Sequence, residues 1–356
     1  MINIIGAGPA GSYTAYLLSK KGREVNVFEE HKKIGLPIQC AGVTTSLLES
    51  MIKLKKDVVV NKINKARIFS PNKKFIEVNL KEKNLVIDRN KFDNQIADMA
   101  KKQGAKFFLN SKFITNKNNY VAIKNNNRIK KIKFDYLIGA DGPLSQVAKS
   151  NNLYKKREFW QGIQARVNLK NNNMIEFYPY FGTYAWVVPE NKDVARVGLV
   201  SQRYTNVLFK NFLFKFKKIK QKDIIEHQGG IIPQHNPWIK TQKDNIYLVG
   251  DAACQVKATT GGGIIQSLIA SKALVDSIKN NKKYGIEWRK LLGKELYAHY
   301  KSRKMMDKFK EKDWNKLVKE INKDVLENND RDNISVMITK LLMKKPSLLY
   351  FAKHLI

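Results

Sequence analysis

Three glycines near the N-terminus have the type and spacing of a nucleotide-binding turn. Gly6, Gly8 and Gly11 occur in the segment GAGPAG, directly after a short apolar stretch, and Glu29 follows about 20 residues further on. In such a turn the first glycine permits the tight bend. The second lets backbone N–H groups reach a pyrophosphate, and the third allows close packing of helix on strand. The helix N-terminus, which includes Ala10, adds partial positive charge, so the segment predicts a pyrophosphate site.

Glu29 indicates which nucleotide the turn binds. A carboxylate at the end of the second strand accepts hydrogen bonds from both hydroxyl groups of an adenosine ribose. The same carboxylate repels a ribose 2′-phosphate, so the pattern favours FAD or NAD over NADP. The structural alternative is a glycine turn in an unrelated α/β domain.

The surrounding pattern predicts the elements that position these residues. Apolar residues at 2–5 and 24–28 predict two strands, and helical spacing over 12–21 predicts a helix between them. Further along, a helix is predicted near 91–103, and an apolar strand over 136–140 ends in a turn. Residues 157–243 are predicted to be mainly strands, and residues after about 280 to be helical.

The composition is strongly basic. The chain of 356 residues has 66 Lys and Arg against 31 Asp and Glu, a formal net charge of +35. Such a charge fits a polyanionic partner, either nucleic acid or an anionic membrane. Lysine far outnumbers arginine, however, whereas nucleic-acid sites favour arginine for bidentate and stacked contacts. Background bias of an AT-rich coding sequence is therefore the preferred explanation, and a nucleic-acid partner is not expected.

Cysteine, histidine and apolar residues exclude several other classes of site. Two cysteines, Cys40 and Cys254, cannot form a disulfide framework, and the five histidines show no metal-ligand spacing. No apolar run reaches the roughly 18 residues of a membrane span. The N-terminus begins with a strand pattern rather than a signal peptide, so we expect a cytoplasmic protein, with peripheral attachment to the inner face of the cell membrane left open.

Five segments occur in one order across about residues 1 to 275. They are GAGPAG with FEE, IQCAGV at 38–43, VIDRNKFDNQIA at 86–97, DYLIGADGPLSQVAK at 135–149 and GDAACQVKATTGGGI at 250–264. Together they resemble the FAD-dependent geranylgeranyl reductase family, within the para-hydroxybenzoate-hydroxylase-like flavoproteins. An NAD dehydrogenase would need only the first segment, so the resemblance implies FAD as the cofactor.

The resemblance also implies a set of FAD contacts. Residues implied to bind the cofactor are Gly6, Gly8, Ala10, Gly11, Glu29, Cys40, Ala41, Gly42, Arg89, Phe113, Asp251, Gly262, Gly263 and Ile264. The CAG triplet at 40–42 should lie near the isoalloxazine ring, and the backbone near residue 113 should contact the adenine. Residues 262–264 should place backbone N–H groups and a helix N-terminus at the flavin pyrimidine edge, where they stabilise negative charge on reduced flavin.

Three of these residues have ordinary structural alternatives. Asp251 is also suited to capping the helix that follows it. Arg89 is also suited to a surface ion pair. Cys40 is also suited to filling a small apolar space in the core.

A short aromatic segment carries the expected substrate side of the site. The stretch YAWVVP at 184–189 resembles the reductase family's YxWxFP element, with Val188 in place of Phe and Gly182 in place of an earlier Pro. Tyr184 and Trp186 alternate along a strand, so both should lie on one face beside the flavin. We predict that they act in catalysis together with Cys40, although an ordinary aromatic core strand remains an alternative. The related WxWxIP pattern of flavin-dependent halogenases is disfavoured, because Tyr184 replaces the first Trp.

The predicted fold class is α/β, with a Rossmann-type FAD-binding domain interleaved with a β-rich substrate domain and followed by a helical C-terminal region. The predicted bounds are 1–55, 84–155 and 244–280 for the first domain, 56–83 and 156–243 for the second, and 281–356 for the helical region. Basic, apolar stretches at 206–222 and from 334 onward suit either helices packed in the core or contact with an anionic membrane surface.

The resemblance implies a reductase that saturates geranylgeranyl double bonds of an ether-linked, archaeal-type phospholipid precursor. Such an enzyme needs a polyprenyl lipid substrate and an electron donor, whether ferredoxin, NAD(P)H or a deazaflavin. Alternatives on the same fold are a flavin monooxygenase or halogenase, a membrane-associated electron-transfer flavoprotein, and a tRNA-modifying flavoprotein. Each differs from a lipid reductase in a product or partner that can be measured.

Overall fold

The computed structural model describes residues 1–126, 128–328 and 332–355. Its first βαβ unit consists of β1 (Ile2–Ile5), α1 (Pro9–Lys20) and β2 (Val25–Phe28), and all residues of both strands are buried. The helix begins three residues earlier than the apolar spacing predicts, because Pro9 occupies its first turn. Proline suits that position, since its fixed φ is helical and its missing N–H would have had no partner inside the helix.

The βαβ unit belongs to a six-stranded sheet with the strand order β16-β17-β10-β1-β2-β6. The other strands are β6 (Lys106–Phe108), β10 (Tyr136–Gly139), β16 (Gln242–Lys243) and β17 (Ile246–Leu248). All pairs are parallel except β16 with β17. Helix α1 packs against α3 (Arg89–Lys102) and α6 (Ile264–Lys279), so segments from three distant parts of the chain meet beside this sheet.

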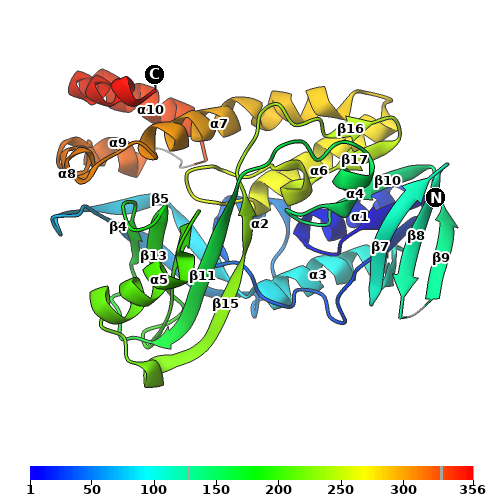
Figure 1. Ribbon diagram of the computed structural model, residues 1–356, viewed down its shortest axis with the longest axis horizontal. Coiled ribbons are helices and arrows are strands. Elements are labelled where there is room, and N and C mark those ends of the chain that lie inside the picture. Colours follow the sequence, from blue (N-terminus) through cyan, green and yellow to red (C-terminus); the bar gives the residue numbers. More distant parts are fainter. Residues whose placement is uncertain (127, 329–331, 356) are drawn as a thin grey trace.

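A smaller three-stranded sheet lies next to the first one (Figure 1). It contains β7 (Ser111–Lys117), β8 (Tyr120–Asn125) and β9 (Arg128–Lys133). Side chains of Phe28, Phe113 and Val121 form one apolar cluster between the two sheets, together with α4 (Gln146–Ser150). This cluster fixes the end of β2, the strand that leads into Glu29.

The β-rich part is an eight-stranded sheet with the order β15-β11-β14-β13-β12-β4-β5-β3. Its strands are β3 (Val43–Thr45), β4 (Val59–Phe69), β5 (Phe75–Ile87), β11 (Phe159–Asn168), β12 (Ile175–Tyr178), β13 (Tyr184–Pro189), β14 (Val194–Ser201) and β15 (Ile224–Pro233). Residues 43–45 and 84–87 pair in this sheet, although the predicted bounds place them in the nucleotide-binding domain. The domain bounds themselves stay a prediction.

The basic segment 206–222 lies against one face of the eight-stranded sheet. It forms α5 (Thr205–Lys210), a π-helical turn over Asn211–Phe216 and a short 3₁₀ turn over Gln221–Asp223. Phe209, Phe212 and Leu213 are buried in one cluster with Val197 and Leu199 of β14. Of the two alternatives for this segment, the structure therefore favours core helices, because these three large apolar side chains are covered by the sheet, although Phe216 is 37% exposed.

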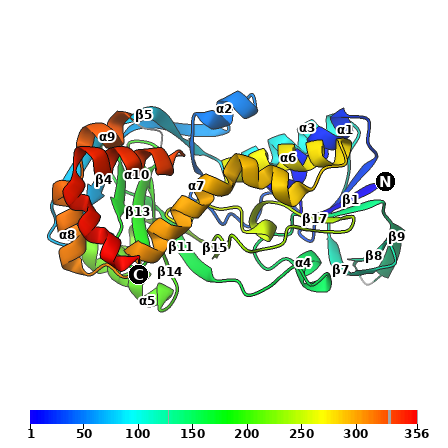
Figure 2. The same cartoon turned by 90° about the horizontal axis from the view of Figure 1, so that it is seen from above.

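The C-terminal region is helical and extends from beside α6 to the end of the molecule opposite β7, β8 and β9 (Figure 2). Helix α7 (Tyr284–Met306) runs from the nucleotide-binding part toward α8 (Glu311–Glu320), α9 (Lys323–Asn328), α10 (Ile334–Lys344) and the 3₁₀ turns of Pro346–His354. Helices α8 and α9 contact β5. Val325 of α9 and Leu341 of α10 belong to one small apolar core in this region. The predicted region 281–356 includes residues 329–331 and 356, which lie outside the described residues. Within the described ranges, no helix is both long and apolar enough to cross a membrane.

Candidate functional site

The glycine turn is tightly packed on one side and open on the other. Gly6 has φ +99°, and a Cβ atom there would lie 2.4 Å from the Ala140 carbonyl oxygen. A Cβ on Gly11 would lie 2.0 Å from the Gly6 carbonyl oxygen, whereas a Cβ on Gly8 would meet nothing within 4 Å. No side chain caps α1, so N–H groups of its first turn point into that open space. This arrangement suits a bound pyrophosphate.

Glu29 lies at the end of β2, directly in front of the turn. Its Oε2 accepts a hydrogen bond from the Ala7 N–H at 2.8 Å, and its Oε1 accepts one from the His31 N–H at 3.0 Å. The Nδ1 atom of His31 lies 2.6 Å from the same Oε1. These contacts fix the orientation of a partly buried carboxylate whose remaining lone pairs can accept ribose hydroxyl groups.

Arg89, Asp93 and Cys40 form a second cluster at the start of α3. The Arg89 guanidinium donates to both carboxylate oxygens of Asp93, at 3.1 and 3.0 Å. Burial opposes the charge of Arg89, but Asp93 and the adjacent Cys40 thiol raise its pKa above the ordinary value. Arg89 is therefore part of a largely buried ion pair rather than a surface one, since its side chain is 16% exposed and that of Asp93 is 5% exposed.

Asp251 lies in a short 3₁₀ turn (Gly250–Ala253), beside the N-terminus of α6. Its Oδ1 is 3.2 Å from the position that a Cβ on Gly263 would take, and no side chain caps the helix, which rules out the capping alternative. Burial raises the pKa of Asp251 to about 6, against the opposing effect of Arg89. Among the described residues, nothing hydrogen-bonds to this carboxylate. Gly262 and Gly263 leave the helix start free of side chains, as the flavin prediction requires.

Phe113, predicted to contact the adenine through its backbone, lies in β7. Its side chain is buried in the cluster between the two smaller sheets, and its backbone faces Ile123 of β8. The side chain therefore contributes to the core. A contact between its backbone and the cofactor stays a prediction.

The segment 40–42 lies between the nucleotide-binding part and the eight-stranded sheet. Gly42 has φ +67°, and a Cβ there would lie 2.4 Å from the Ile87 carbonyl oxygen and 2.6 Å from a guanidinium nitrogen of Arg196. Cys40 is half-buried, and its Sγ accepts the Gly42 N–H at 3.3 Å. Cys40 also lies close enough to Tyr184 to influence that hydroxyl group electrostatically. The fold therefore places Cys40 within electrostatic range of Tyr184, and their joint role in catalysis stays a prediction.

Aromatic side chains form a wall on the adjoining face of the sheet. The Tyr184 ring centroid is 5.8 Å from that of Trp186 and 6.0 Å from that of Trp160, which meets it edge-on. Tyr184 donates a 2.6 Å hydrogen bond to the Thr260 carbonyl, and burial raises the pKa of Tyr184. Because Thr260 lies in the loop before α6, this bond connects the aromatic wall to the predicted flavin loop. The Trp160 and Trp186 indole N–H groups are buried and have no hydrogen-bond partner among the described residues.

Sequence reasoning missed the side chains that complete this face. Trp160, Gly162, Gln164 and Arg166 alternate along β11 and point to the side that bears Trp186, while the intervening Ala165 and Val167 face the helices. Arg196 of β14 is buried on the same side. The sequence did contain one signal for them: Gln164 and Arg166 of β11, and Arg196 of β14, are polar residues within mostly apolar strands.

Comparisons with known proteins identify the family. Residues 4–47 match a model described as an NAD(P)-binding Rossmann-like domain. The chain is 30% identical to a digeranylgeranylglycerophospholipid reductase of Methanocaldococcus jannaschii, over 99% of this chain and 97% of that protein. It is 32% identical to digeranylgeranylglycerophospholipid reductase 3 of Methanosphaera stadtmanae, over 95% and 89%. The chain belongs to the digeranylgeranylglycerophospholipid reductase family.

Solved structures agree with this family at the level of the fold. A geranylgeranyl bacteriochlorophyll reductase-like protein from Thermoplasma acidophilum superposes with a TM-score of 0.83 at 24% identity, covering 100% of this chain and 98% of that one. A flavin-dependent brominase superposes with a TM-score of 0.69 at 14% identity, covering 86% and 87%. The predicted fold class of this digeranylgeranylglycerophospholipid reductase family member is confirmed.

Proposed function

We propose that this protein is an FAD-dependent reductase that saturates geranylgeranyl double bonds of an archaeal-type ether phospholipid precursor. The observation that carries the proposal is the near full-length similarity to reductases of that name in two archaea. The aromatic wall of Trp160, Tyr184 and Trp186 also supports it. Trp160 and Tyr184 are buried in one apolar cluster, and Trp186 is the partly exposed member against which an apolar chain would pack.

The residues of the nucleotide site fit FAD. The glycine turn and the uncapped start of α1 would hold the pyrophosphate, and Glu29 would hold the adenosine ribose. Asp251 and the uncapped start of α6 would face the ribityl chain and the flavin ring. When bound and reduced, the flavin supplies a hydride for one alkene carbon, while a proton reaches the other.

The protein's own side chains would position the lipid and exclude water. An isolated alkene has no carbonyl group to activate it, so its reduction depends on orientation and on stabilising positive charge in the chain. The faces of Tyr184 and Trp186 provide packing and attract a developing cation. The hydrogen bond from Tyr184 to Thr260 fixes the orientation of that ring. Cys40, whose thiol interacts with the Arg89 guanidinium, is the side chain we place at the reacting face.

Two partners complete the proposal. The electrons would come from a ferredoxin, a nicotinamide or a deazaflavin, since the protein needs an external reductant for each turnover. The C-terminal region would contact the lipid at an anionic membrane face. Its apolar residues Met343, Leu349 and Leu355 and its lysines Lys344 and Lys345 are exposed.

The test is an anaerobic reduction with FAD-loaded protein, dithionite as the reductant and a digeranylgeranylglyceryl phospholipid as the substrate. We expect the lipid to gain two hydrogens for each double bond reduced, as followed by mass spectrometry. A sample without protein is the control for chemical reduction by dithionite. A fully reduced, FAD-loaded enzyme that leaves every alkene intact would refute the proposal.

Assays in air and with a quinone separate the alternatives. A monooxygenase or halogenase would release peroxide in air, or add oxygen or halogen to a substrate. An electron-transfer flavoprotein would pass electrons to a quinone and leave the lipid unchanged. A flavin-dependent brominase and a flavin-dependent halogenase share the fold with this chain at 14 to 15% identity.

A further inference from the structure

Three successive backbone carbonyl groups of segment 40–42 each receive a hydrogen bond from a different strand. Gln164 of β11 donates to the Cys40 carbonyl at 3.3 Å, and Arg196 of β14 donates to the Ala41 carbonyl at 2.6 Å. The Ile87 N–H of β5 donates to the Gly42 carbonyl at 2.8 Å. The segment lies outside every helix and strand, so these donors replace the partners that regular structure would supply.

Arg196 makes the shortest of these bonds and also reaches a neighbouring strand. The nitrogen that binds the Ala41 carbonyl donates to the Ile87 carbonyl at 3.1 Å as well. A single guanidinium group thus connects segment 40–42 to the end of β5, two residues before Arg89. Arg196 therefore holds the segment that contains Cys40 in place relative to the start of α3, where Arg89 adjoins the Cys40 thiol.

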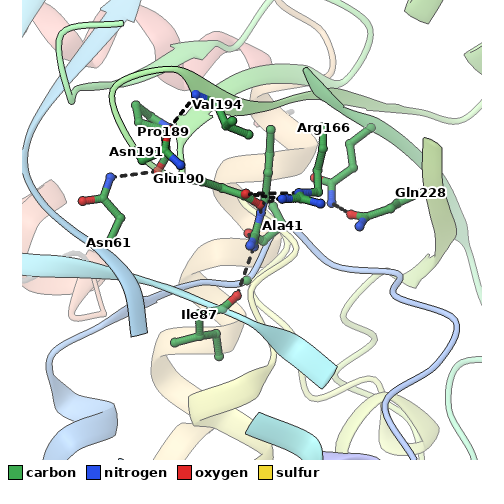
Figure 3. A network of polar contacts seen from close by, with 12 residues as sticks. Ala41, Asn61, Ile87, Arg166, Pro189, Glu190, Asn191, Val194 and Gln228 are labelled. Atoms are coloured by element: carbon green, nitrogen blue, oxygen red, sulfur yellow. Dashed lines mark hydrogen bonds and ion pairs between the residues drawn. The ribbon is translucent and has the colours of Figure 1, made fainter. Parts of the chain in front are cut away.

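The charge of Arg196 is buried and balanced by Glu190. Both side chains are 8% exposed, and the Arg196 Nε donates to Glu190 Oε1 at 2.5 Å. Arg166 contacts both oxygens of the same carboxylate, through bonds of 2.9 to 3.1 Å. The two guanidinium groups lower the pKa of Glu190 although burial raises it, so the carboxylate stays ionised at neutral pH. Figure 3 shows this carboxylate beside Arg166.

The hydrogen bonds close into a ring that begins and ends on segment 40–42. From Glu190, Arg166 continues to Glu226 at 3.0 Å, and Gln228 donates to the same Glu226 oxygen at 3.0 Å. Gln164 donates to Gln228 at 2.5 Å and to the Cys40 carbonyl. The six side chains of the ring are Gln164, Arg166, Glu190, Arg196, Glu226 and Gln228. Figure 3 shows the part of this network around Ala41 and Ile87.

Strand register explains why the ring forms. Gln164 faces Gln228, and Arg166 faces both Glu226 and Arg196, across the antiparallel pairs β11–β15 and β11–β14. Residues two apart on one strand share a face, so all of these side chains lie on the side that bears Trp186. The polar ring and the aromatic wall are therefore parts of one surface.

We propose that Arg196 is a positioning residue, which holds segment 40–42 in the conformation that places Cys40 at the reacting face. The inference rests on the proposed function and adds a residue to it. A planar guanidinium is required, because one group must bind a carboxylate and two carbonyl oxygens in different directions. Lysine has the charge but carries all its donors on one nitrogen, so it cannot reproduce this geometry.

The experiment measures Cys40 directly, with or without bound flavin. Cys254, the other cysteine of the chain, is completely buried, so iodoacetamide labelling of the folded protein reports on Cys40. We expect Arg196→Lys to label at least about tenfold faster than the wild type, because a buried charge-assisted hydrogen bond is lost. With the lipid, kcat should fall about tenfold or more while KM changes by less than about twofold, since the aromatic wall is intact.

Two further variants serve as controls. Arg203→Lys makes the same chemical change at an exposed arginine just beyond β14 and should match the wild type in labelling and in kcat. Gln164→Met removes the donor to the Cys40 carbonyl without changing a charge, and should accelerate labelling even if Arg196→Lys does not fold. Melting curves identify any variant that has unfolded.

The outcomes separate this inference from the proposed function. If Arg196→Lys and Gln164→Met are folded and label at the wild-type rate, Arg196 does not position the segment. If Arg196→Lys has the kcat of the wild type, the positioning role in catalysis is refuted. If the wild type saturates no lipid while Arg196→Lys still exposes Cys40, the proposed function fails and the anchoring of the segment stands.

Discussion

At the scale of single residues, the site is distinguished by buried charges and by which of them have partners. Glu29, Arg89 and Arg196 are each held by hydrogen bonds from or to neighbouring groups. Asp251 differs, because its carboxylate has no hydrogen-bond partner among the described residues. Desolvation raises its pKa. Polar groups withdrawn from water are normally paired, and this carboxylate is partly withdrawn, so it is well placed to bind a hydroxyl group of the ligand.

The raised pKa of Asp251 predicts a pH-dependent effect of replacing it. The folded-state pKa of about 6 exceeds the ordinary value of 3.8, so the folded protein retains a proton that the unfolded chain has lost. The free energy of unfolding therefore falls as pH rises from about 4 to about 6 and stays lower above that range. We expect Asp251→Asn, in flavin-free protein, to raise the melting temperature relative to wild type more at pH 7.5 than at pH 4.

Asp193→Asn is the matched control, since Asp193 is an exposed aspartate in the turn before β14. Its melting temperature relative to wild type should not follow the same pH dependence. An equal effect of Asp251→Asn at both pH values would contradict the assignment of a raised pKa to this carboxyl group.

At the scale of elements, the site is built where helices begin and where strands present one face. Helices α1 and α6 both start without a side-chain cap, at Gly8 and Gly263, and both starts belong to the predicted cofactor site. Strands β11, β13 and β14 present the aromatic wall and the polar ring on one side and apolar residues to α5 on the other. The backbone N–H groups at these helix starts can donate hydrogen bonds to a phosphate or to a reduced flavin ring.

Replacing either of two glycines of the turn by alanine should have different effects on stability. Gly8→Ala should fold normally, with a melting temperature within about 2 °C of wild type, because its Cβ meets no protein atom. It should nevertheless weaken FAD binding by about tenfold or more, since the new methyl group points into the space assigned to the pyrophosphate. Flavin fluorescence titration measures the affinity.

Gly11→Ala is the comparison. Its Cβ would lie 2.0 Å from a backbone oxygen, so the turn must shift and the protein should lose stability. Unchanged FAD affinity in a folded Gly8→Ala protein would mean that the pyrophosphate lies elsewhere.

At the scale of the whole molecule, α7 connects the nucleotide-binding part to the C-terminal helices, which cover the far end of the eight-stranded sheet (Figure 2). The apolar residues of 206–222 are largely used in the core, so the exposed apolar side chains of the C-terminal region are the better candidates for a lipid surface. With a net charge of +35, an anionic surface would attract the whole molecule, and those side chains would determine its orientation.

Vesicle binding tests this arrangement. We expect the protein to co-sediment with anionic phospholipid vesicles at low salt, to be released as salt shortens the Debye length to about 3 Å at 1 M, and to ignore neutral vesicles. Met343→Glu should weaken binding, since Met343 is 77% exposed on α10. Ile129→Glu, at a residue 61% exposed on β9, makes the same change of charge at the opposite end of the molecule and should weaken binding less. Equal losses in both variants would leave only a non-specific effect of charge.

The sequence by itself determined the nucleotide turn, the fold class and the family. These depend on local rules. Glycine occurs where the backbone bends or comes close to another chain segment, and proline where a helix begins. Apolar residues recur at the spacing of a strand or of a helix. Such signals lie within a few neighbouring residues, so they can be recognised without knowing the rest of the fold. Gly6, Gly11 and Pro9 have the conformations and contacts that their positions in the motif predict.

The tertiary structure alone decided what surrounds Cys40. Arg196, Gln164 and Glu190 carry no local motif, and their partnership depends on the register of strands that are far apart in the sequence. Whether the apolar residues of 206–222 face lipid or core was likewise open until the sheet that covers them was known. The physical reason is common to both cases. Burial and charge pairing depend on which chain segments meet in space, and a one-residue change of register would move each of these side chains to the other face.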